Sequence, residues 1–218
     1  MSRYTRIMSK LADLRKSYTR DSLSESDVAQ DPIEQFRRWF EQAKSAECPE
    51  PNAMTVASAN KDGIPSARVV LLKEVDHQGF VFFTNYLSQK GKELTENPHA
   101  ALLFHWHELE RQVRIEGRVQ KLDQNLSDEY YASRPLDSRI GAWASPQSEV
   151  ISGRTTLIAK AAEFGLKFGL NPPRPPHWGG FLVIPNKIEF WQGRPSRLHD
   201  RICFSKENDH WKIVRLAP

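Results

Sequence analysis

The sequence predicts a mainly β protein of the α+β class, an antiparallel barrel with helices between and around its strands. Three observations lead to this class. Apolar residues alternate with a period near two in many short stretches, turn signals such as Asp62-Gly63 separate these stretches at hairpin spacing, and helical periodicity appears in the intervals. With 218 residues, 39% of them hydrophobic, the chain is long enough to bury a full core.

We expect a mobile N-terminal segment over residues 1–30 and a single domain over residues 31–218. Residues 3–18 can form a basic amphipathic helix with Ile7, Leu11 and Leu14 on one side. Residues 19–30 are polar and non-periodic, and terminal segments of this kind are commonly poorly ordered.

The first helix of the domain begins after Asp31, which is a good N-cap, and Pro32 suits the first helical position. Glu34, three residues after the cap, completes a pattern like a capping box. The apolar residues that follow repeat at helical spacing and indicate a face packed on the core; they are Phe36, Trp39, Phe40 and Ala43.

The remaining elements follow from changes of period and from turn residues. Strands are expected over residues 54–59, 64–72, 80–85, 100–106, 112–122, 181–190, 202–205 and 210–216. Helices are expected over residues 88–96, 124–134 and 154–168, because Ser88 caps the first, Pro135 ends the second and a proline cluster follows the third. Neither a Gly-x-Gly-x-x-Gly motif after a strand nor a P-loop occurs, so nucleotide folds of those types lack support.

Composition narrows the class of protein. No apolar run approaches the ~20 residues of a membrane span, and no signal-peptide core follows the N-terminus. Two cysteines, Cys48 and Cys203, are too few for a disulfide framework, so a cytoplasmic location is expected. The net charge of +4 is compatible with an anionic ligand, and the basic residues are dispersed, so neither a nucleic acid nor a membrane is an expected partner.

The stretch from Trp191 to Arg201 is rich in groups that bind ligands. It lies between two expected strands and contains Arg194, Arg197 and His199. Guanidinium groups recognise phosphate or carboxylate, an imidazole changes charge near neutral pH, and an indole offers a flat apolar face. The stretch therefore suggests a site for a planar, anionic small molecule, and a solvated basic loop is about equally compatible with it.

Three other stretches can bind anions. In Arg68-Val-Val-Leu-Leu-Lys73, four apolar residues suit a strand buried on both faces, with the two cations on opposite faces, although strand-end cations often only reach into solvent. Lys90 lies at a helix N-terminus, where anions bind, or on a solvated helix face. Tyr130, Arg134 and Ser138, spaced four apart, can form a phosphate clamp or pack at a helix end.

A metal site is not expected. His105 and His107 are spaced to place both imidazoles on one face of a strand, but no third ligand is evident nearby, and zinc needs three or four. No Ser-His-Asp or Cys-His arrangement can be assembled from the spacing.

Together these stretches resemble the pyridoxine/pyridoxamine 5′-phosphate oxidase family. The resemblance covers nearly the whole chain from about Leu14. The matching motifs are Arg68-Val-Val-Leu-Leu-Lys73, Phe83-Thr-Asn85, Trp106-His-x-Leu-Glu-Arg-Gln112, Ser133-Arg-Pro-x-Asp-Ser138, Ile140-Gly-Ala-Trp143, Gln147-Ser148, Ile188-Glu-Phe-Trp-Gln-Gly193, Arg197-Leu-His-Asp-Arg201 and Arg215-Leu-Ala-Pro218.

The resemblance implies an FMN-binding split barrel and assigns site residues by matched position. FMN is expected to contact Arg68, Val69, Val70, Leu71, Leu72, Lys73, Phe83, Thr84, Gln89, Lys90, Gln112, Gln147, Ser148, Trp191 and Arg201. The substrate is expected to contact Arg15, Tyr18, Lys73, Tyr130, Arg134, Ser138, Arg197, Leu198 and His199, with Arg197 and His199 as the catalytic pair. The family usually has arginine where this chain has Gln89, so one cationic contact to the FMN phosphate is in doubt.

The chemistry implied by the resemblance is oxidation of pyridoxine or pyridoxamine 5′-phosphate to pyridoxal 5′-phosphate. A hydride passes from C4′ to the flavin N5, O2 accepts the electrons to give H2O2, and ammonia is released from the amine. A homodimer with FMN at the interface is implied as well. The alternatives are a split-barrel flavin reductase, which needs no phosphate clamp, and a module that only stores flavin or haem.

Overall fold

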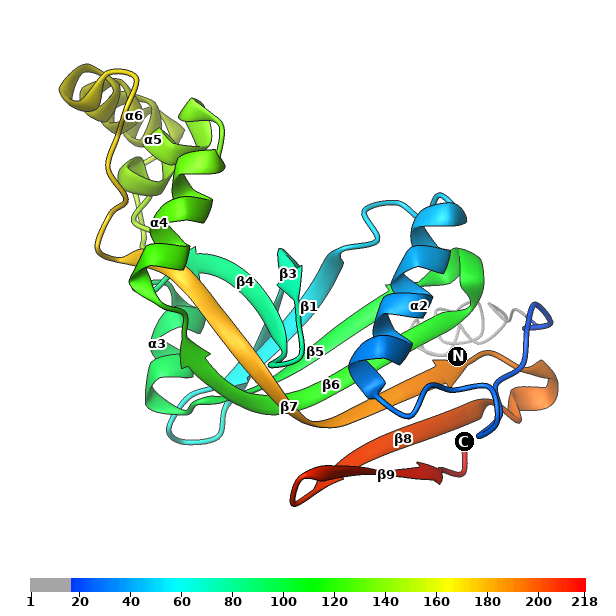
Figure 1. The fold of residues 1–218 in the computed structure, drawn as a ribbon. Coiled ribbons are helices and arrows are strands. Elements are labelled where there is room, and N and C mark those ends of the chain that lie inside the picture. Colours follow the sequence, from blue (N-terminus) through cyan, green and yellow to red (C-terminus); the bar gives the residue numbers. More distant parts are fainter. Residues whose placement is uncertain (1–16) are drawn as a thin grey trace, which may run out of the picture.

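The structure is a computed structural model that describes residues 17–218. Most of the helix expected over residues 3–18 lies outside the described residues, and so does Arg15. A nine-stranded antiparallel sheet in the order β2-β1-β5-β6-β7-β4-β3 curls into a half-barrel, with β8 and β9 continuing from β7 (Figure 1). The strands are β1 (Ala53–Ala59), β2 (Pro65–Leu71), β3 (Glu74–Val75), β4 (Phe80–Asn85), β5 (His99–Trp106), β6 (Arg111–Lys121), β7 (Trp178–Gln192), β8 (Asp200–Glu207) and β9 (His210–Arg215).

Five α-helices surround the sheet in the described chain. They are α2 (Pro32–Ser45), α3 (Gln89–Glu96), α4 (Gln124–Ser133), α5 (Leu136–Ala144) and α6 (Arg154–Phe168), and short 3₁₀ turns span His107–Leu109 (η1) and Pro195–Arg197 (η2). The prediction of an α+β antiparallel barrel is confirmed. None of the helices within residues 17–218 is long and apolar enough to cross a membrane.

Helix α2 covers one face of the curled sheet, as its sequence predicts. Asp31 caps it, with the side chain accepting a hydrogen bond from the Ile33 N–H at 2.7 Å, and Pro32 occupies the first turn. Phe36 is buried, and its ring centre lies 5.0 Å from those of Phe80 and Phe104 in edge-to-face geometry. Such aromatic pairs contribute about 0.5–1.5 kcal/mol each beyond their burial, so this helix anchors the core.

Strand β7 divides the sheet into two parts. Its first residues, Trp178 to Val183, pair with β4, its last six pair with β8, and β6 runs beside it from residue 181 to 192. The β6–β7 register shifts at Gly117, where an added Cβ atom would lie 2.3 Å from the Ile184 carbonyl oxygen. Only glycine fits this approach, and the irregularity marks the position where β7 leaves β4 and reaches β8.

Three features differ from the sequence-based expectations. Strand β2 is not buried on both faces: Val69 is 67% exposed, so the described chain leaves one face of this strand uncovered there. Pro135 ends α4 as expected, but it also stands at the N-cap of α5, so the chain re-enters a helix at once. In the segment expected to be mobile, Leu23 and Val28 are buried in the core, and its mobility stays a prediction.

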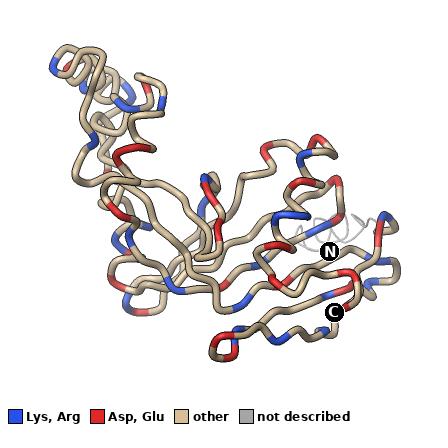
Figure 2. The backbone as a smooth tube through the Cα atoms, in the orientation of Figure 1, with Lys and Arg blue, Asp and Glu red and all other residues tan. Residues whose placement is uncertain are grey.

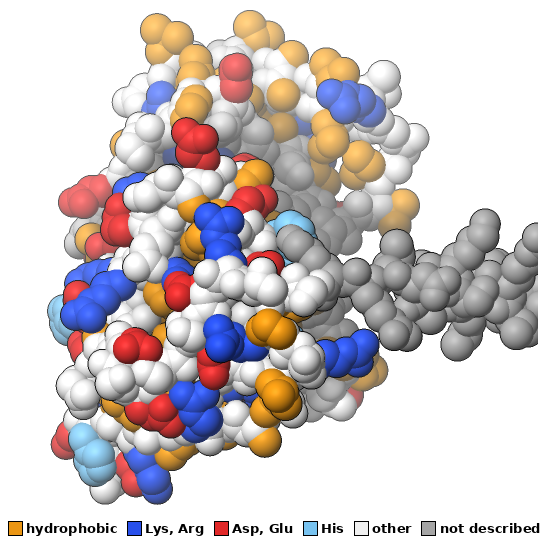
Figure 3. Space-filling model, turned by 90° about the vertical axis from the view of Figure 1, so that its right-hand side faces the viewer, with side chains coloured by type: hydrophobic (Ala, Val, Ile, Leu, Met, Phe, Trp, Pro, Cys, Tyr) orange, Lys and Arg blue, Asp and Glu red, His pale blue; other side chains and the backbone are white. Residues whose placement is uncertain are grey.

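Charges are spread over the whole backbone, as Figure 2 shows, with no continuous basic stripe along residues 17–218. On the side of the molecule drawn in Figure 3, basic and acidic side chains are interspersed. Helices α5 and α6 project from the sheet (Figure 1), and α6 has no buried residue.

Candidate active site

A cavity of about 490 Å³ lies where the ends of β2 and β4 meet the end of α4. Its size falls within the usual range for small-molecule sites. Most of its lining had been predicted from the sequence: Val69, Val70, Leu71, Lys73, Phe83, Thr84, Lys90, Tyr130, Arg134, Ser138 and Gln147. The sequence reasoning missed Asn85, Pro135 and Trp178, which complete the lining.

One wall of the cavity is a stack of aromatic rings. The ring centre of Phe83 lies 4.0 Å from that of Tyr130 and 5.4 Å from that of Trp178, in nearly parallel planes. The ammonium of Lys73 lies 5.9 Å from the Tyr130 ring centre. Because Trp178 is the first residue of β7 and Phe83 lies on the neighbouring β4, sheet pairing sets the position of this wall.

Arg134 carries a buried donor that has no acceptor. Its guanidinium carbon lies 4.5 Å from the Trp178 ring centre, and Nη1 is buried without a hydrogen-bond partner among the described residues. Burial lowers the pKa of Arg134, but an arginine stays charged at neutral pH. A buried charged donor without a partner is unfavourable by at least about 1–3 kcal/mol, so the arrangement suits an anionic ligand that supplies the acceptor.

Lys90 is a second cation of the cavity, in the first turn of α3. Its ammonium is buried and donates only to neutral oxygens: Gln147 Oε1 at 3.0 Å, Thr84 Oγ1 at 3.2 Å and Ser88 Oγ at 3.3 Å. Burial lowers the pKa of Lys90, the nearby charge of Arg68 lowers it further, and Glu93 opposes both. A buried ammonium at a helix N-terminus is an anion-binding arrangement.

Not all of the predicted cofactor residues of β2 and α3 line the cavity. Arg68 does not line the cavity; it donates to Ser58 Oγ at 2.6 Å, and its Nη2 lies 3.6 Å from a Glu93 carboxylate oxygen. Leu72 is a buried core residue. Gln89 joins the cavity region through its backbone N–H, which donates to Ser148 Oγ at 3.2 Å.

A second group of predicted residues surrounds η2, after β7. The ring centre of His199 lies 4.6 Å from that of Trp191 and 5.8 Å from that of Tyr18. His199 Nδ1 accepts the Arg194 N–H at 3.1 Å, so the neutral ring carries its proton on Nε2. Burial and the charge of Arg197 lower the pKa of His199, against the opposing effect of Asp200.

Other side chains of this second group lie at the surface or in a row across the sheet. Arg197 and Leu198 are exposed, with Leu198 71% accessible, and Arg197 has a positive φ of 62°. Strand register places Gln112 on β6 beside Trp191 on β7, and Trp191 beside Arg201 on β8. This row and the η2 loop form a ledge, which we name the β7 ledge.

Tyr18 is held over the β7 ledge by the residues that follow it. The backbone N–H groups of Thr19 and Arg20 donate to Glu110 Oε2 at 2.9 and 3.1 Å, and the Leu23 N–H donates to Asp200 Oδ2 at 3.0 Å. These bonds fix the chain on both sides of the ledge.

Arg201 is fixed by a buried carboxylate. Its Nε lies 2.8 Å and its Nη2 3.0 Å from the two oxygens of Glu189, a fork geometry, and Glu189 also pairs with Arg114 at 3.3 Å. Hydrogen bonding to Glu189 raises the pKa of Arg201. The guanidinium is therefore held in one orientation at the end of the row.

The cavity and the β7 ledge lie at opposite ends of one strand. Trp178 begins β7 and Trp191 nearly ends it, and β7 is 15 residues long. At about 3.3 Å per residue they are on the order of 40 Å apart along the strand. Within one chain, the structure does not bring Arg197 and His199 to the cavity (Figure 1).

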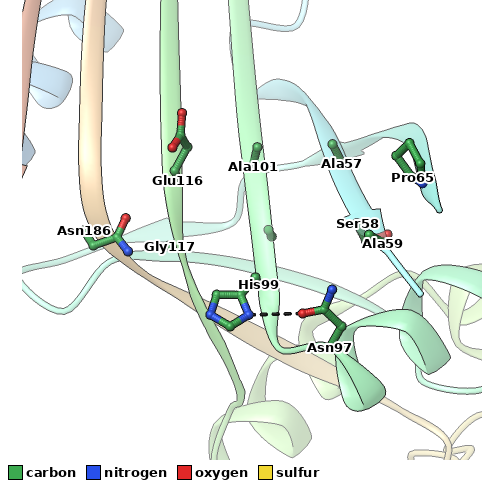
Figure 4. Close-up of a pocket in the computed structure, with 11 residues that line it drawn as sticks. Ala57, Ser58, Ala59, Pro65, Asn97, His99, Ala101, Glu116, Gly117 and Asn186 are labelled. Carbon is green, nitrogen blue, oxygen red and sulfur yellow. Dashed lines mark hydrogen bonds between the residues drawn. The ribbon is translucent and has the colours of Figure 1, made fainter. Parts of the chain in front are cut away.

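Other candidate positions hold none of the predicted site residues. A shallower hollow of about 430 Å³ lies over β1, β5 and β6, where His99 and Asn97 share a hydrogen bond of 3.1 Å (Figure 4). The rings of His105 and His107 are 5.9 Å apart, and within residues 17–218 no three His, Cys, Asp or Glu side chains are grouped as metal ligands. Cys48 and Cys203 are buried free thiols.

Comparison with known proteins matches this architecture over nearly the whole chain. Residues 40–168 match the family described as "Pyridoxamine 5'-phosphate oxidase", and residues 178–218 match the "Pyridoxine 5'-phosphate oxidase C-terminal dimerisation region". A pyridoxine/pyridoxamine 5′-phosphate oxidase of Cupriavidus pinatubonensis is 62% identical over 212 residues, which are 97% of this chain and 100% of the relative. One from Burkholderia vietnamiensis is 61% identical over 214 residues, with the same coverage.

Solved structures agree with the fold. PhzG from Burkholderia lata, in complex with tetrahydrophenazine-1-carboxylic acid, superposes with a TM-score of 0.86 at 34% identity, covering 93% of this chain and 100% of that one. A pyridoxamine 5′-phosphate oxidase-related, FMN-binding protein from Nostoc punctiforme has a TM-score of 0.67 at 14% identity, over 84% and 97% of the two chains, and supports the fold alone.

The curled antiparallel sheet with a cationic, aromatic-walled cavity defines a split-barrel protein with a small-molecule site. The two family models and the relatives above 60% identity go further: the chain belongs to the pyridoxamine 5′-phosphate oxidase family. It is therefore an oxidoreductase.

Proposed function

We propose that the chain oxidises pyridoxine 5′-phosphate or pyridoxamine 5′-phosphate to pyridoxal 5′-phosphate, with FMN as cofactor and O2 as electron acceptor. The observation that carries this proposal is the buried Nη1 of Arg134, which has no acceptor among the described residues and lines a cavity with Lys73, Tyr130 and Ser138. The names of the relatives at 62% and 61% identity give the same substrates.

The substrate phosphate is the proposed partner of Arg134. A phosphate oxygen on Nη1 removes the unfavourable burial of that donor, while the Lys73 ammonium and the hydroxyls of Tyr130 and Ser138 supply further donors. Binding energy from this remote handle positions the reacting carbon, which is how a non-reacting group raises turnover. The carboxylic acid in the PhzG complex is a different anion, so phosphate dependence separates the two substrate types.

The residues present also fit FMN. Lys90 is a buried ammonium with only neutral partners at the first turn of α3, which suits the cofactor phosphate, and Phe83 with Val69 to Leu71 offers apolar surface to a ring. When bound, FMN would supply the redox chemistry, removal of a hydride from C4′ with O2 as the final electron acceptor to give H2O2, and water would be consumed as ammonia leaves the amine substrate. The protein contributes orientation and electrostatics.

Arg197 and His199 are proposed to hold the substrate ring. The neutral His199 exposes an Nε2 proton to a ligand, because Nδ1 is occupied by the Arg194 N–H. The Arg197 guanidinium stabilises negative charge that develops when the C4′ hydroxyl or amine loses its proton. Tyr18 closes over this ring from the segment fixed by Glu110 and Asp200.

A complete site is proposed to need two copies of the chain. The cavity lies at one end of β7 and the β7 ledge at the other, so a second copy supplies the ledge to the cavity of the first. The match of residues 178–218 to a dimerisation region supports this homodimer, because that region contains the whole ledge strand and loop. In the same proposal residues 31–218 act as one domain, and the reaction takes place in the cytoplasm.

The central test removes the phosphate clamp. Arg134→Ala is expected to raise KM for pyridoxine 5′-phosphate roughly 10- to 150-fold, which corresponds to a charged hydrogen bond of ~1.5–3 kcal/mol. Turnover of unphosphorylated pyridoxine is expected to be equally low in the parent and in Arg134→Ala. Arg154→Ala, on the exposed start of α6, is the matched control. A purified parent protein that releases no peroxide with either phosphorylated vitamer contradicts the function.

Mixing the two impaired variants, assayed at a substrate concentration well below the KM of Arg134→Ala, tests the shared site. When Arg134→Ala and Arg197→Ala dimers are dissociated and reassociated together, heterodimers contain one intact site if each site takes Arg134 and Arg197 from different chains. Random pairing of a two-fold dimer then restores about one quarter of the parental activity. If both residues act from the same chain, no heterodimer site is intact and the activity stays at the level of the separate variants.

A further inference from the structure

Glu93 is a buried acid beside the proposed cofactor phosphate site, and nothing in the proposed reaction uses it. It lies in α3, one turn after Lys90, and is 6% exposed. One carboxylate oxygen accepts the hydroxyls of Ser58 at 2.5 Å and Ser66 at 2.6 Å, and the other accepts the Gln89 side-chain amide at 2.9 Å. A buried carboxylate is expected only where it is paired, so its neighbours identify what it compensates.

The charge that Glu93 compensates belongs to Arg68. The Arg68 Nη2 lies 3.6 Å from the carboxylate, and both hydroxyls that donate to Glu93 accept from Arg68, Ser58 at 2.6 Å and Ser66 at 2.5 Å. Burial by itself raises the pKa of Glu93, but the hydrogen bonds of Ser58, Ser66 and Gln89 and the charge of Arg68 outweigh it and keep the pKa below its ordinary value. Glu93 is thus ionised at neutral pH.

Arg68 and Arg134 differ in whether the chain itself supplies acceptors for their guanidinium groups. Arg134 has a buried Nη1 without an acceptor, whereas Arg68 has acceptors on both terminal nitrogens from within the chain. Arg68 therefore needs no ligand to satisfy it. A phosphate group bound at Lys90 meets one cation in the cavity and the field of a second, Arg68, outside the lining, and the charge of Glu93 opposes both.

We propose that Glu93 is an internal counter-ion of the cofactor phosphate site, which stabilises the empty site and lowers its affinity for the phosphate of FMN. The inference rests on the proposed use of FMN. It assigns Glu93 a positioning role through Arg68 and Lys90, without contact to the cofactor. Gln89, which holds the second carboxylate oxygen, belongs to the same arrangement.

Titration of stripped protein with FMN, followed by quenching of flavin fluorescence, tests the role. Glu93→Gln is expected to bind FMN roughly tenfold more tightly than the parent, because the cations beside the phosphate lose their competing anion. Its flavin-free form is expected to melt about 5 °C lower, because a buried cation is left without its partner. Glu93→Asp, which keeps the charge, is expected to bind FMN as the parent does.

Glu96→Gln provides the matched control, since it removes the same charge from an exposed position at the end of α3. It is expected to change neither FMN affinity nor melting. Unchanged or weaker FMN binding by Glu93→Gln overturns the proposal. Absence of FMN binding by the parent contradicts the proposed function instead, so the two failures are distinguishable.

The pH profile of FMN affinity adds a readout that a purely structural role does not move. Affinity is expected to fall at alkaline pH as Lys90 loses its proton. The described charges facing Lys90 are Arg68 from β2 and Glu93 from α3, and Lys73 lines the same cavity. Because Glu93 raises the pKa of Lys90, Glu93→Gln is expected to shift this alkaline limb to lower pH, and an unshifted limb counts against the role.

The test remains decisive if Glu93→Gln does not fold alone. The variant is then refolded with saturating FMN, or with inorganic phosphate as the simpler anion. Recovery of folded protein with FMN supports the counter-ion role, because the ligand phosphate replaces the missing carboxylate. Failure to fold even with FMN overturns it.

Discussion

The ring of Tyr18 lies in the space that a side chain at position 193 would occupy. A Cβ atom built on Gly193 would be 2.7 Å from Cγ and 2.8 Å from Cβ of Tyr18, too close for any real contact. These atoms are near the Tyr18 backbone, which the bonds to Glu110 and Asp200 hold in place. The close approach sets the height of Tyr18 above Trp191 and His199.

Gly193→Ala is expected to displace Tyr18 and to lower kcat/KM for pyridoxine 5′-phosphate by roughly 10- to 100-fold, because misplacement by about 1 Å is enough for such losses. Steady-state kinetics measure the effect. Gly165→Ala is the control, since its Cβ would make an ordinary 3.7 Å contact with Ile140. Equal kinetics of the two variants would show that Tyr18 does not act on the substrate.

Arg197→Ala is expected to keep bound flavin and to lose most turnover, because Arg197 is exposed on the η2 loop and supports no core contact. Flavin content after gel filtration and the rate of peroxide formation are the two measurements. A variant that oxidises pyridoxine 5′-phosphate at the parental rate would remove Arg197 from the mechanism.

His199 is expected to impose an acid limb on activity. Its lowered pKa means that the folded protein favours the neutral ring, so protonation begins only below the ordinary value near 6.5 and then disrupts the bond from the Arg194 N–H. The neutral ring therefore contributes fully to the free energy of unfolding above the ordinary pKa of histidine, and this contribution declines as the pH falls below that pKa.

Neighbouring charges move this acid limb in opposite directions. In Arg197→Ala the pKa of His199 is expected to rise, because a like charge is removed, and in Asp200→Asn it is expected to fall. An NMR titration of the His199 ring protons measures both shifts, and the same sign in both variants would contradict this electrostatic account.

Arg68→Ala is expected to lower FMN affinity about 10- to 150-fold and also to destabilise the flavin-free protein, since Glu93 is left buried without its cation. The double variant Arg68→Ala with Glu93→Gln is expected to recover part of the lost stability. Thermal melting of the four proteins gives the coupling, and strictly additive losses would show that the two side chains do not interact.

Glu189→Gln is expected to destabilise the fold by about 1.5–3 kcal/mol, because the fork with Arg201 loses its charge inside the sheet. Denaturant unfolding measures it. Glu207→Gln, which removes the exposed pair with Lys212, is the control and is expected to have little effect.

Local signals were sufficient for much of the fold. The cap at Asp31 and the stripe through Phe36 depend on neighbours in sequence, so α2 was predicted correctly. Helix α5 was missed because Pro135 signals a helix end and its second use as an N-cap depends on the following turn. The exposure of Val69 was not predicted, because a run of four apolar residues does not reveal which face of a strand the rest of the chain leaves uncovered.

The candidate site was predicted mainly through resemblance to a family. Residues in recognisable motifs were found, whereas residues whose role depends on partners far away in the sequence were missed. Lys73, Tyr130 and Arg134 belong to quotable motifs and meet in one cavity. Trp178 was missed because it looks like the start of an apolar strand, and its role arises from stacking on Phe83. Glu93 was missed because its partners Ser58 and Ser66 lie on two other strands.

Strand β7 sets the distance between the cavity and the β7 ledge. Because Trp178 and Trp191 stand on one strand, the separation between the cavity and the β7 ledge within a chain is set by the number of residues along β7. Insertion or deletion of a single residue between them would turn every later side chain, including those of the β7 ledge, to the opposite face of the sheet. The number of residues in β7 is therefore a geometric constraint on the β7 ledge that the surface loops do not share.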